Sequence, residues 1–155
     1  MKGDPKIIDL LNDLLSDELT AINQYIVHSE MCADWTYNEL HEAIEARAIQ
    51  EMKHAEKLIG RILFLEGIPI VSNLKNIHIG ADVETQHKND AEAELDAIKL
   101  YNNGIRQAVE LGDNGTRELL ESILKEEEEH LDWLEAQLEL IRQMGIQNYL
   151  VEQLG

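Results

Sequence analysis

The 155-residue sequence contains few residues that interrupt helices or cross-link chains. It has two prolines and 5% aromatic residues against 44% hydrophobic residues, a composition typical of long helices packed around one core. Its single cysteine, Cys32, cannot form an intramolecular disulfide. We therefore expect Cys32 to act as a small hydrophobic residue and the protein to be cytoplasmic, where thiols stay reduced.

Basic residues are also scarce, because 13 Lys and Arg stand against 31 Asp and Glu, for a formal net charge of −18. Such a charge disfavours nucleic-acid binding, since phosphates would be repelled, and instead attracts cations. No hydrophobic run approaches the roughly 18 residues of a membrane span, and Met1–Pro5 does not open a signal peptide. We expect neither a nucleic-acid partner nor a membrane association.

Hydrophobic residues recur with helical spacing in four long segments. Asp4 is a suitable N-cap and Pro5 a suitable first residue for the first helix, and Asp82 can cap the third. Gly67 is expected to end the second helix. We predict helices over about 5–33, 39–66, 83–110 and 116–144, with a short amphipathic helix within 146–154.

The segment 67–82 has no helical pattern. Sixteen extended residues span roughly 50 Å, whereas a helix of about 27 residues is roughly 40 Å long. The segment can therefore cross the whole bundle, which would make the third helix parallel to the second. The sequence predicts an all-α fold in one domain, residues 1–155: a four-helix bundle with a long crossover between helices two and three and a short fifth C-terminal helix.

Polar residues interrupt the hydrophobic faces of these helices. Glu51 and His54 lie three residues apart, so on a helix they share a face. That face also carries Ile44, Ala48 and Leu58, which directs both polar side chains into the core. Burying an isolated carboxylate costs several kcal/mol or more unless it is paired or bound to a cation.

The same arrangement recurs in the second half of the chain as Glu127-x-x-His130, and Glu18 and Glu94 each interrupt one further helix. Glu18 precedes Glu51 by 33 residues (51 − 18), and Glu94 precedes Glu127 by 33 (127 − 94). The two halves are thus offset by 76 residues (94 − 18). Packed together, four glutamates and two histidines would meet in one layer at the middle of the bundle.

Four carboxylates and two imidazoles suit two divalent first-row metal ions, with carboxylates bridging and each imidazole terminal. Four negative charges also balance two such ions. One glutamate on a hydrophobic face is usually a boundary residue, and Glu-x-x-His arises by chance in an acidic chain. Matched spacing in four helices favours the metal centre. We expect Glu126, Glu128 and Glu129 to form only a solvated acidic face.

Several segments of the chain resemble bacterioferritin, collinearly from Met1 to about Gln153. They are Leu-x-x-Glu18-Leu-Thr-Ala-Ile-x-Gln-Tyr25, Glu51-Met-Lys-His54-Ala, Arg61-Ile-Leu-Phe-Leu-Glu-Gly67, Glu126-Glu127-x-x-His130-x-Asp-Trp-Leu-Glu135 and Met144-Gly-Ile-Gln-Asn-Tyr149. The resemblance implies a ferritin-like fold and a di-iron ferroxidase centre that oxidises Fe(II) to Fe(III) with O₂ or H₂O₂. It also implies a shell of 24 subunits that stores the ferric mineral.

In that family pattern the centre consists of Glu18, Glu51, His54, Glu94, Glu127 and His130. Glu51 and Glu127 would bridge the two irons. Glu18 with His54 would complete one iron site, and Glu94 with His130 the other. Tyr25, seven residues after Glu18, is either an electron donor, a hydrogen-bond partner of a ligand or an ordinary core tyrosine.

Met52 has two interpretations. Its position beside the metal face would by itself indicate a subunit contact filled by a flexible side chain. The resemblance implies instead an axial ligand of haem b at a dimer two-fold axis, where haem assists iron release with electrons from a ferredoxin-type reductant. Leu19, Ile22, Ile26 and Ile49 could line that slot.

One departure from the family and two alternative functions follow from the same residues. Several bacterioferritins carry a histidine and an aspartate, which form an inner-surface iron site, at the positions of Ala46 and Gln50. Alanine cannot ligate iron and a neutral amide is a poor ligand, so the sequence leaves open whether this chain has such a site and an electron route through it. The alternatives are a di-iron or di-manganese peroxidase or catalase, and a haem-carrying cage with little turnover. A rubrerythrin-like enzyme would need a Cys-x-x-Cys iron domain that one cysteine cannot provide.

Overall fold

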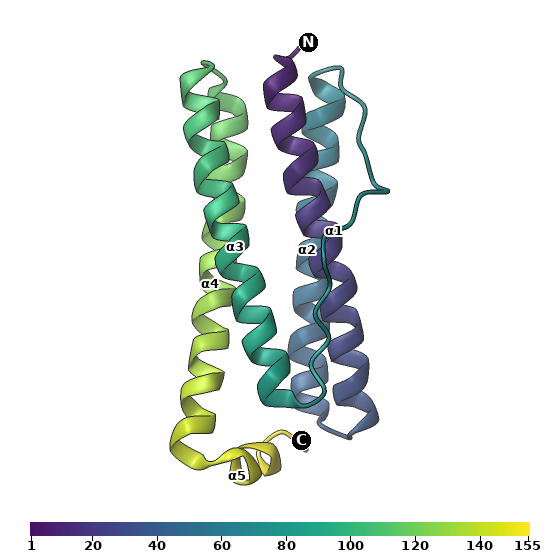
Figure 1. Ribbon diagram of the computed structural model, residues 1–155, viewed down its shortest axis with the longest axis vertical. Coiled ribbons are helices and arrows are strands. Elements are labelled where there is room, and N and C mark those ends of the chain that lie inside the picture. The colour runs from purple at the N-terminus through teal and green to yellow at the C-terminus, as the bar shows by residue number, and fades with distance from the viewer.

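The computed structural model describes all residues from Met1 to Gly155, and all of its regular secondary structure is helical (Figure 1). The elements are α1 (Pro5–Asp34), α2 (Asn38–Phe64), α3 (Val83–Glu110), α4 (Asn114–Met144) and α5 (Ile146–Val151). The predicted all-α fold, a four-helix bundle with a short C-terminal helix, is confirmed. None of the helices combines the length and the hydrophobicity that crossing a bilayer requires.

The predicted N-caps of α1 and α3 are formed. The Asp4 carboxylate accepts a hydrogen bond from the Lys6 backbone N–H at 2.8 Å, and Pro5 occupies the first turn of α1. Asp82 accepts from the Thr85 N–H at 2.8 Å at the start of α3. Short polar side chains therefore set where these two helices begin, as the sequence indicated.

α2 ends two residues earlier than predicted, at Phe64, because Glu66 adopts a left-handed conformation with φ 62°. The Gly67 N–H still donates to the Ile62 carbonyl at 2.9 Å, which closes the helix end. Glycine is needed at 67 for a different reason than expected. A Cβ there would lie 2.7 Å from a side-chain methyl of Ile8 on α1, so the turn packs too closely for a larger residue.

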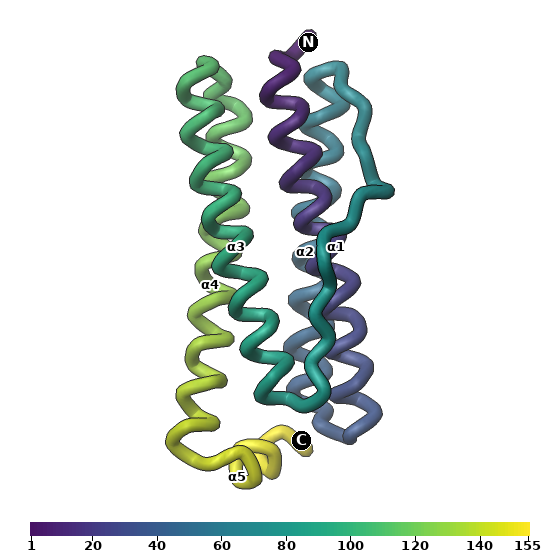
Figure 2. The backbone as a smooth tube through the Cα atoms, in the orientation of Figure 1, coloured from purple at the N-terminus to yellow at the C-terminus, as the bar shows by residue number.

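The crossover between α2 and α3 lies along α1 and runs the length of the bundle, so α3 is parallel to α2 as predicted (Figure 2). Five polar side chains spaced four residues apart on α1 hold it. Asn12 donates to the Ile68 carbonyl at 3.1 Å and accepts from the Ile70 N–H at 2.8 Å. The other hydrogen bonds are Ser16 Oγ to the Asn73 carbonyl at 2.6 Å, the Lys75 N–H to Thr20 Oγ1 at 2.8 Å, the His78 N–H to Gln24 Oε1 at 3.1 Å and the Gly80 N–H to His28 Nε2 at 3.0 Å. The connection is therefore fixed to the bundle.

Two hydrophobic clusters fill the bundle. One includes Leu11, Leu58, Ile62 and Leu120, and the other includes Ile44, Ile141, Cys32 and Tyr149. Cys32 is fully buried, as predicted for a small hydrophobic residue, and α5 contributes Tyr149 to the second cluster. The predicted polar residues occupy the layer between these clusters.

Candidate metal centre

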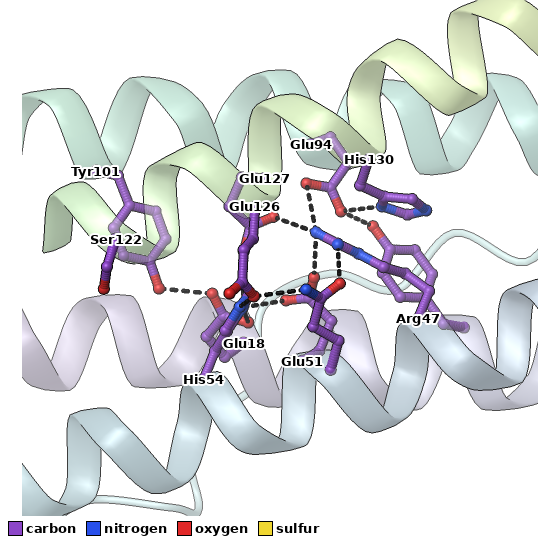
Figure 3. Close-up of polar contacts among 12 residues, drawn as sticks. Glu18, Arg47, Glu51, His54, Glu94, Tyr101, Ser122, Glu126, Glu127 and His130 are labelled. Atoms are coloured by element: carbon purple, nitrogen blue, oxygen red, sulfur yellow. Dashed lines mark hydrogen bonds and ion pairs between the residues drawn. The ribbon is translucent and has the colours of Figure 1, made fainter. Parts of the chain in front are cut away.

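The structure brings together all six residues that the sequence singled out (Figure 3). Glu18, Glu51, Glu94, Glu127 and His54 are each 1% exposed, and His130 is 8% exposed. Glu18, Glu51, His54 and Glu127 offer ligand atoms that all lie within 4.8 Å of one another, and so do Glu51, Glu94 and His130. Glu51 belongs to both groups, so the two groups form one continuous cluster.

Five buried polar atoms in this cluster have no hydrogen-bond partner. They are Glu18 Oε2, Glu51 Oε1, His54 Nδ1, Glu94 Oε2 and Glu127 Oε1. Leaving one buried acceptor unsatisfied typically costs about 1–3 kcal/mol, so five at one place require an explanation. Carboxylate oxygens and imidazole nitrogens are ligands that divalent first-row metals accept, and the donor set fits such ions.

A tyrosine from the opposite half contacts each of the two lone glutamates. Tyr101 on α3 donates a hydrogen bond to Glu18 Oε1 at 2.5 Å, and Tyr25 on α1 donates to Glu94 Oε1. Each tyrosine follows the lone glutamate of its own helix by seven residues (25 − 18 and 101 − 94). Of the roles considered for Tyr25, the structure favours hydrogen bonding to a candidate ligand. Tyr101 was expected only as a hydrophobic position.

Both ring nitrogens of His54 lie close to a carboxylate. Nδ1 faces the cluster, 3.2 Å from Glu127 Oε1, whereas Nε2 lies 2.6 Å from Glu126 Oε2. Carboxylates commonly orient metal-binding histidines in this way. The prediction that Glu126 is only solvated was therefore wrong, while Glu128 and Glu129 are exposed as expected.

His130 has different surroundings. Its Nδ1 lies 2.8 Å from Glu94 Oε1, and its ring stacks on Trp133 with an interplanar angle of 18°. Burial lowers the pKa of His130, although the hydrogen bond to Glu94 opposes the effect. His130 is thus held neutral, with the ring fixed by an aromatic neighbour instead of a second carboxylate.

Arg47 on α2 also enters the cluster, which the sequence analysis did not anticipate. It is 7% exposed, and its Nη2 lies 2.9 Å from Glu51 Oε1, 3.3 Å from Glu127 Oε2 and 3.8 Å from Glu94 Oε2. A usable signal existed, because Arg47 precedes Glu51 by four residues and so lies on the same helix face.

Burial raises the pKa of Glu18 well above its usual value, and the charge of Glu51 adds to this effect. Burial likewise raises the pKa of Glu94, with a further contribution from Glu127. Without a metal, protonated carboxyls at these two positions relieve the repulsion among four neighbouring acids.

The pKa values of Glu51 and His54 are both shifted in the direction that favours the charged form. Burial alone would raise the pKa of Glu51, but hydrogen bonds with Glu18 and His54 and the charge of Arg47 lower it to about 2. Burial alone would lower the pKa of His54, but Glu127, Glu51 and Glu126 raise it to about 10. The metal-free centre therefore contains two positive side chains, Arg47 and His54.

A cavity of about 780 Å³ connects this cluster with the surface. Its lining includes the buried carboxylates of Glu51, Glu94 and Glu127 and the exposed acidic residues Glu92 and Asp96. The cavity lies beside the crossover, which contributes Lys75, Asn76 and His78 to the lining. Small ions can reach the buried carboxylates without unfolding of the bundle.

Met52 lies outside the cluster, on the outward face of α2, with 46% of its surface exposed. Ile26 on α1 and Ile49 on α2 are also nearly half exposed, whereas Leu19 and Ile22 are partly buried against the core. Such hydrophobic surface is typical of an interface with a partner.

Comparison with known proteins gives one consistent result. A model of the Ferritin-like domain matches residues 8–144. The bacterioferritin BfrA of Mycobacterium tuberculosis is 41% identical over 149 residues, which cover 96% of this chain and 94% of that protein. The bacterioferritins of Brucella melitensis and Rhodobacter capsulatus are each 40% identical over 149 residues, covering 96% of this chain and 92% of each relative.

Proposed function

Because the chain belongs to the bacterioferritin family of iron-storage proteins, we propose that its buried cluster is a ferroxidase centre that takes Fe(II) as substrate. The observation that carries this proposal is the set of five unsatisfied buried ligand atoms at the middle of the bundle. A pair of Fe(II) ions would satisfy these atoms and neutralise the four carboxylates.

The six residues divide the work between two iron positions. Glu18 and His54 complete the first position, and Glu94 and His130 complete the second. Glu51 and Glu127 bridge the two, which agrees with the membership of Glu51 in both groups of clustered ligand atoms. Tyr101 and Tyr25 orient the two terminal glutamates through their hydroxyls.

The proposed reaction consumes protons as well as O₂: 4 Fe(II) + 4 H⁺ + O₂ gives 4 Fe(III) + 2 H₂O. H₂O₂ is an alternative oxidant, in which case 2 Fe(II) + 2 H⁺ + H₂O₂ gives 2 Fe(III) + 2 H₂O. The raised pKa values of Glu18, Glu94 and His54 mean that Fe(II) binding first displaces protons from these groups. The protein contributes ligand geometry and matched charge, while the electrons come from the iron.

The cavity beside the crossover supports a direct route for the substrate. Exposed Glu92 and Asp96 at its surface attract Fe(II), and Glu51, Glu94 and Glu127 receive it at the inner end. The net charge of −18 favours cation capture over the whole surface.

We further propose that the chain forms a cytoplasmic shell of 24 copies built from haem-bridged dimers. The half-exposed Met52, with Ile26 and Ile49, provides an apolar face with a thioether, which fits haem b held by one Met52 from each subunit. Haem bound there would supply an electron path from a ferredoxin-type reductant to the stored iron. The free thiol of Cys32 agrees with a reducing compartment.

Iron loading of the purified metal-free protein tests this function. We expect Fe(II) oxidation much faster than in protein-free buffer, with O₂ uptake approaching one O₂ per four Fe(II), and a native particle that gains iron. Its mass and haem content report the assembly. Oxidation at the protein-free rate would contradict the ferroxidase centre, and rapid disproportionation of H₂O₂ without iron retention would favour a catalase.

A further inference from the structure

The Arg47 guanidinium occupies the space in which the second iron would bind. Its Nη2 lies 2.9 Å from Glu51 Oε1, 3.3 Å from Glu127 Oε2 and 3.8 Å from Glu94 Oε2, that is, among the two proposed bridging residues and the terminal glutamate of the second position. A guanidinium and a divalent ion cannot share such a space, both for steric reasons and because like charges repel strongly in a buried site. Arg47 is therefore a positive group inside the candidate iron position.

Arg47 places a positive charge near Glu51 and Glu94 but donates no hydrogen bond to either of them. Glu51 Oε1 and Glu94 Oε2 lie within ion-pair distance of it, yet neither accepts a hydrogen bond, and Arg47 Nε has no partner either. Its hydrogen bonds go only to Glu127 at 3.3 Å and to Gln50. A permanent structural arginine would normally use its planar donors bidentately on a carboxylate. Arg47 makes no bidentate pair with any of the three carboxylates around it.

Arg47 makes ion pairs with Glu51, Glu94 and Glu127. In the half of the cluster around Glu18 the nearby nitrogen belongs to His54, which is itself a candidate metal ligand. The two iron positions are therefore not equivalent before metal arrives, even though their ligands correspond.

We propose that Arg47 is a tethered cation that occupies the second iron position and must withdraw before the second Fe(II) binds. This inference rests on the proposed ferroxidase function and adds an order of filling: the Glu18–His54 position fills first, and the Glu94–His130 position fills only when Arg47 leaves. The arginine thereby keeps the metal-free carboxylates neutralised and makes the second binding step the weaker one.

Hydrogen bonds connect Arg47 with partly exposed side chains. Arg47 Nη1 donates to Gln50 Oε1, and Gln50 Nε2 donates to Glu126 Oε2 at 2.5 Å. Gln50 and Glu126 are partly exposed, so this direction leads out of the core to a carboxylate that can receive the guanidinium. The same Glu126 holds His54 Nε2, so the path of withdrawal connects the two iron positions.

Anaerobic titration of the metal-free full-length protein with Co²⁺ tests the order of filling, because Co²⁺ is redox-stable here and its visible spectrum reports coordination. A surface group formed by Glu30, His41 and Glu45 would also bind the probe, so all proteins carry His41→Ala. We compare this background protein with Arg47→Gln, which replaces the charged guanidinium by a neutral, polar amide. Arg106→Gln, an arginine exposed on α3, is the matched control.

In the background protein we expect two Co²⁺ per subunit, the second bound more weakly than the first by about tenfold or more, because a buried positive charge must be displaced. Arg47→Gln should tighten the second step by about the same factor and leave the first step nearly unchanged. Arg106→Gln should reproduce the background. A crystal structure of the Co²⁺-loaded background protein should place the guanidinium outside the Glu51–Glu94 space.

Two ions bound with equal affinity in the background, or no tightening in Arg47→Gln, would overturn the inference and leave the ferroxidase function intact. Two bound Co²⁺ with Arg47 unmoved would overturn it as well. Failure of every variant to bind Co²⁺ at the buried cluster would contradict the proposed function itself. If metal-free Arg47→Gln does not fold, the protein is purified with Co²⁺, and stepwise removal by a chelator gives the same ratio of affinities.

Discussion

The two halves of the buried cluster carry the same ligands in different electrostatic surroundings. An offset of 76 residues relates Glu18 to Glu94, Tyr25 to Tyr101, Glu51 to Glu127 and His54 to His130. Some residues between the ligands are not repeated at this offset. Arg47 corresponds to the buried core residue Ile123 (47 + 76), and Gln50 corresponds to Glu126 (50 + 76).

These exceptions decide how each half behaves. The first half has a histidine whose pKa is raised to about 10 and whose far nitrogen contacts Glu126. The second half has a neutral histidine stacked on Trp133 and a guanidinium among its carboxylates. The comparison teaches that the repeat specifies coordination geometry, whereas a few unrepeated residues specify charge and proton uptake.

Removing a bridge should disable both halves and have the largest effect. Glu127→Ala deletes a carboxylate that lies 3.2 Å from His54 Nδ1 and 3.3 Å from Arg47 Nη2. We expect initial Fe(II) oxidation to fall by more than about 100-fold, the upper range for loss of an outer partner, while the shell still assembles. Glu128→Ala, on the adjacent exposed position, is the control. A wild-type initial rate in Glu127→Ala would refute the bridging role.

Glu126→Gln should act on the first half most directly, through His54. The amide can still accept a hydrogen bond from His54 Nε2 but no longer stabilises the ring by charge. We expect the first Co²⁺ to bind about 10- to 100-fold more weakly, the typical cost of changing the outer partner of a metal-binding histidine. Glu129→Gln, also on α4 and exposed, should bind Co²⁺ like the wild type. An unchanged first step in Glu126→Gln would mean that this contact does not tune the centre.

Proton release should distinguish the halves further. Glu18, Glu94 and His54 have raised pKa values, so the metal-free protein holds protons there at neutral pH, and metal binding must displace them. Metal affinity should therefore rise with pH up to about pH 10, where His54 loses its proton unaided. A pH-stat should record proton release when Fe(II) is added anaerobically.

Paired histidine variants sharpen that measurement. At one metal ion per subunit, His54→Gln should release fewer protons than wild type, because glutamine carries no titratable proton. His130→Gln should release as many as wild type, since burial lowers the pKa of His130 and leaves it neutral. Equal counts for the two variants would contradict the electrostatic difference between the halves.

Met52→Leu should leave both halves unchanged, which makes it the smallest of these effects on iron oxidation. Leucine matches methionine in volume, so packing at any dimer contact should lose less than about 1.5 kcal/mol. The thioether lone pair is lost, and with it the haem Soret band, while reductive iron release should slow. A retained haem spectrum would show that Met52 is not the axial ligand. Unchanged iron release from a haem-free shell would show that haem takes no part in the release of iron.

The repeat explains why so much was predictable from the sequence. Helix periodicity located α1 to α4, and matched spacing identified the six buried polar residues that the structure brings together. Arg47, Tyr101 and Glu126 were not predicted, because helix periodicity places charged residues on the surface and aromatic residues in the hydrophobic core. The sequence predicted no role for Arg47, although it shares the face of Glu51, or for the hydroxyl of Tyr101, and Glu126 was expected to be solvated. Which way such long side chains turn depends on partners from other helices, and one helix pattern does not contain that information.

The division of the bundle into two helical hairpins has a consequence for how the chain folds. α1 and α2 form one antiparallel hairpin and α3 and α4 another, each closed by a short turn, so each can form from contacts that are local in sequence. Each hairpin contributes only two glutamates and one histidine, and the tyrosine that each lone glutamate needs comes from the other hairpin. A half-folded chain thus presents no complete metal site. If the cluster binds Fe(II) as proposed, both hairpins must dock before a complete site for the metal exists.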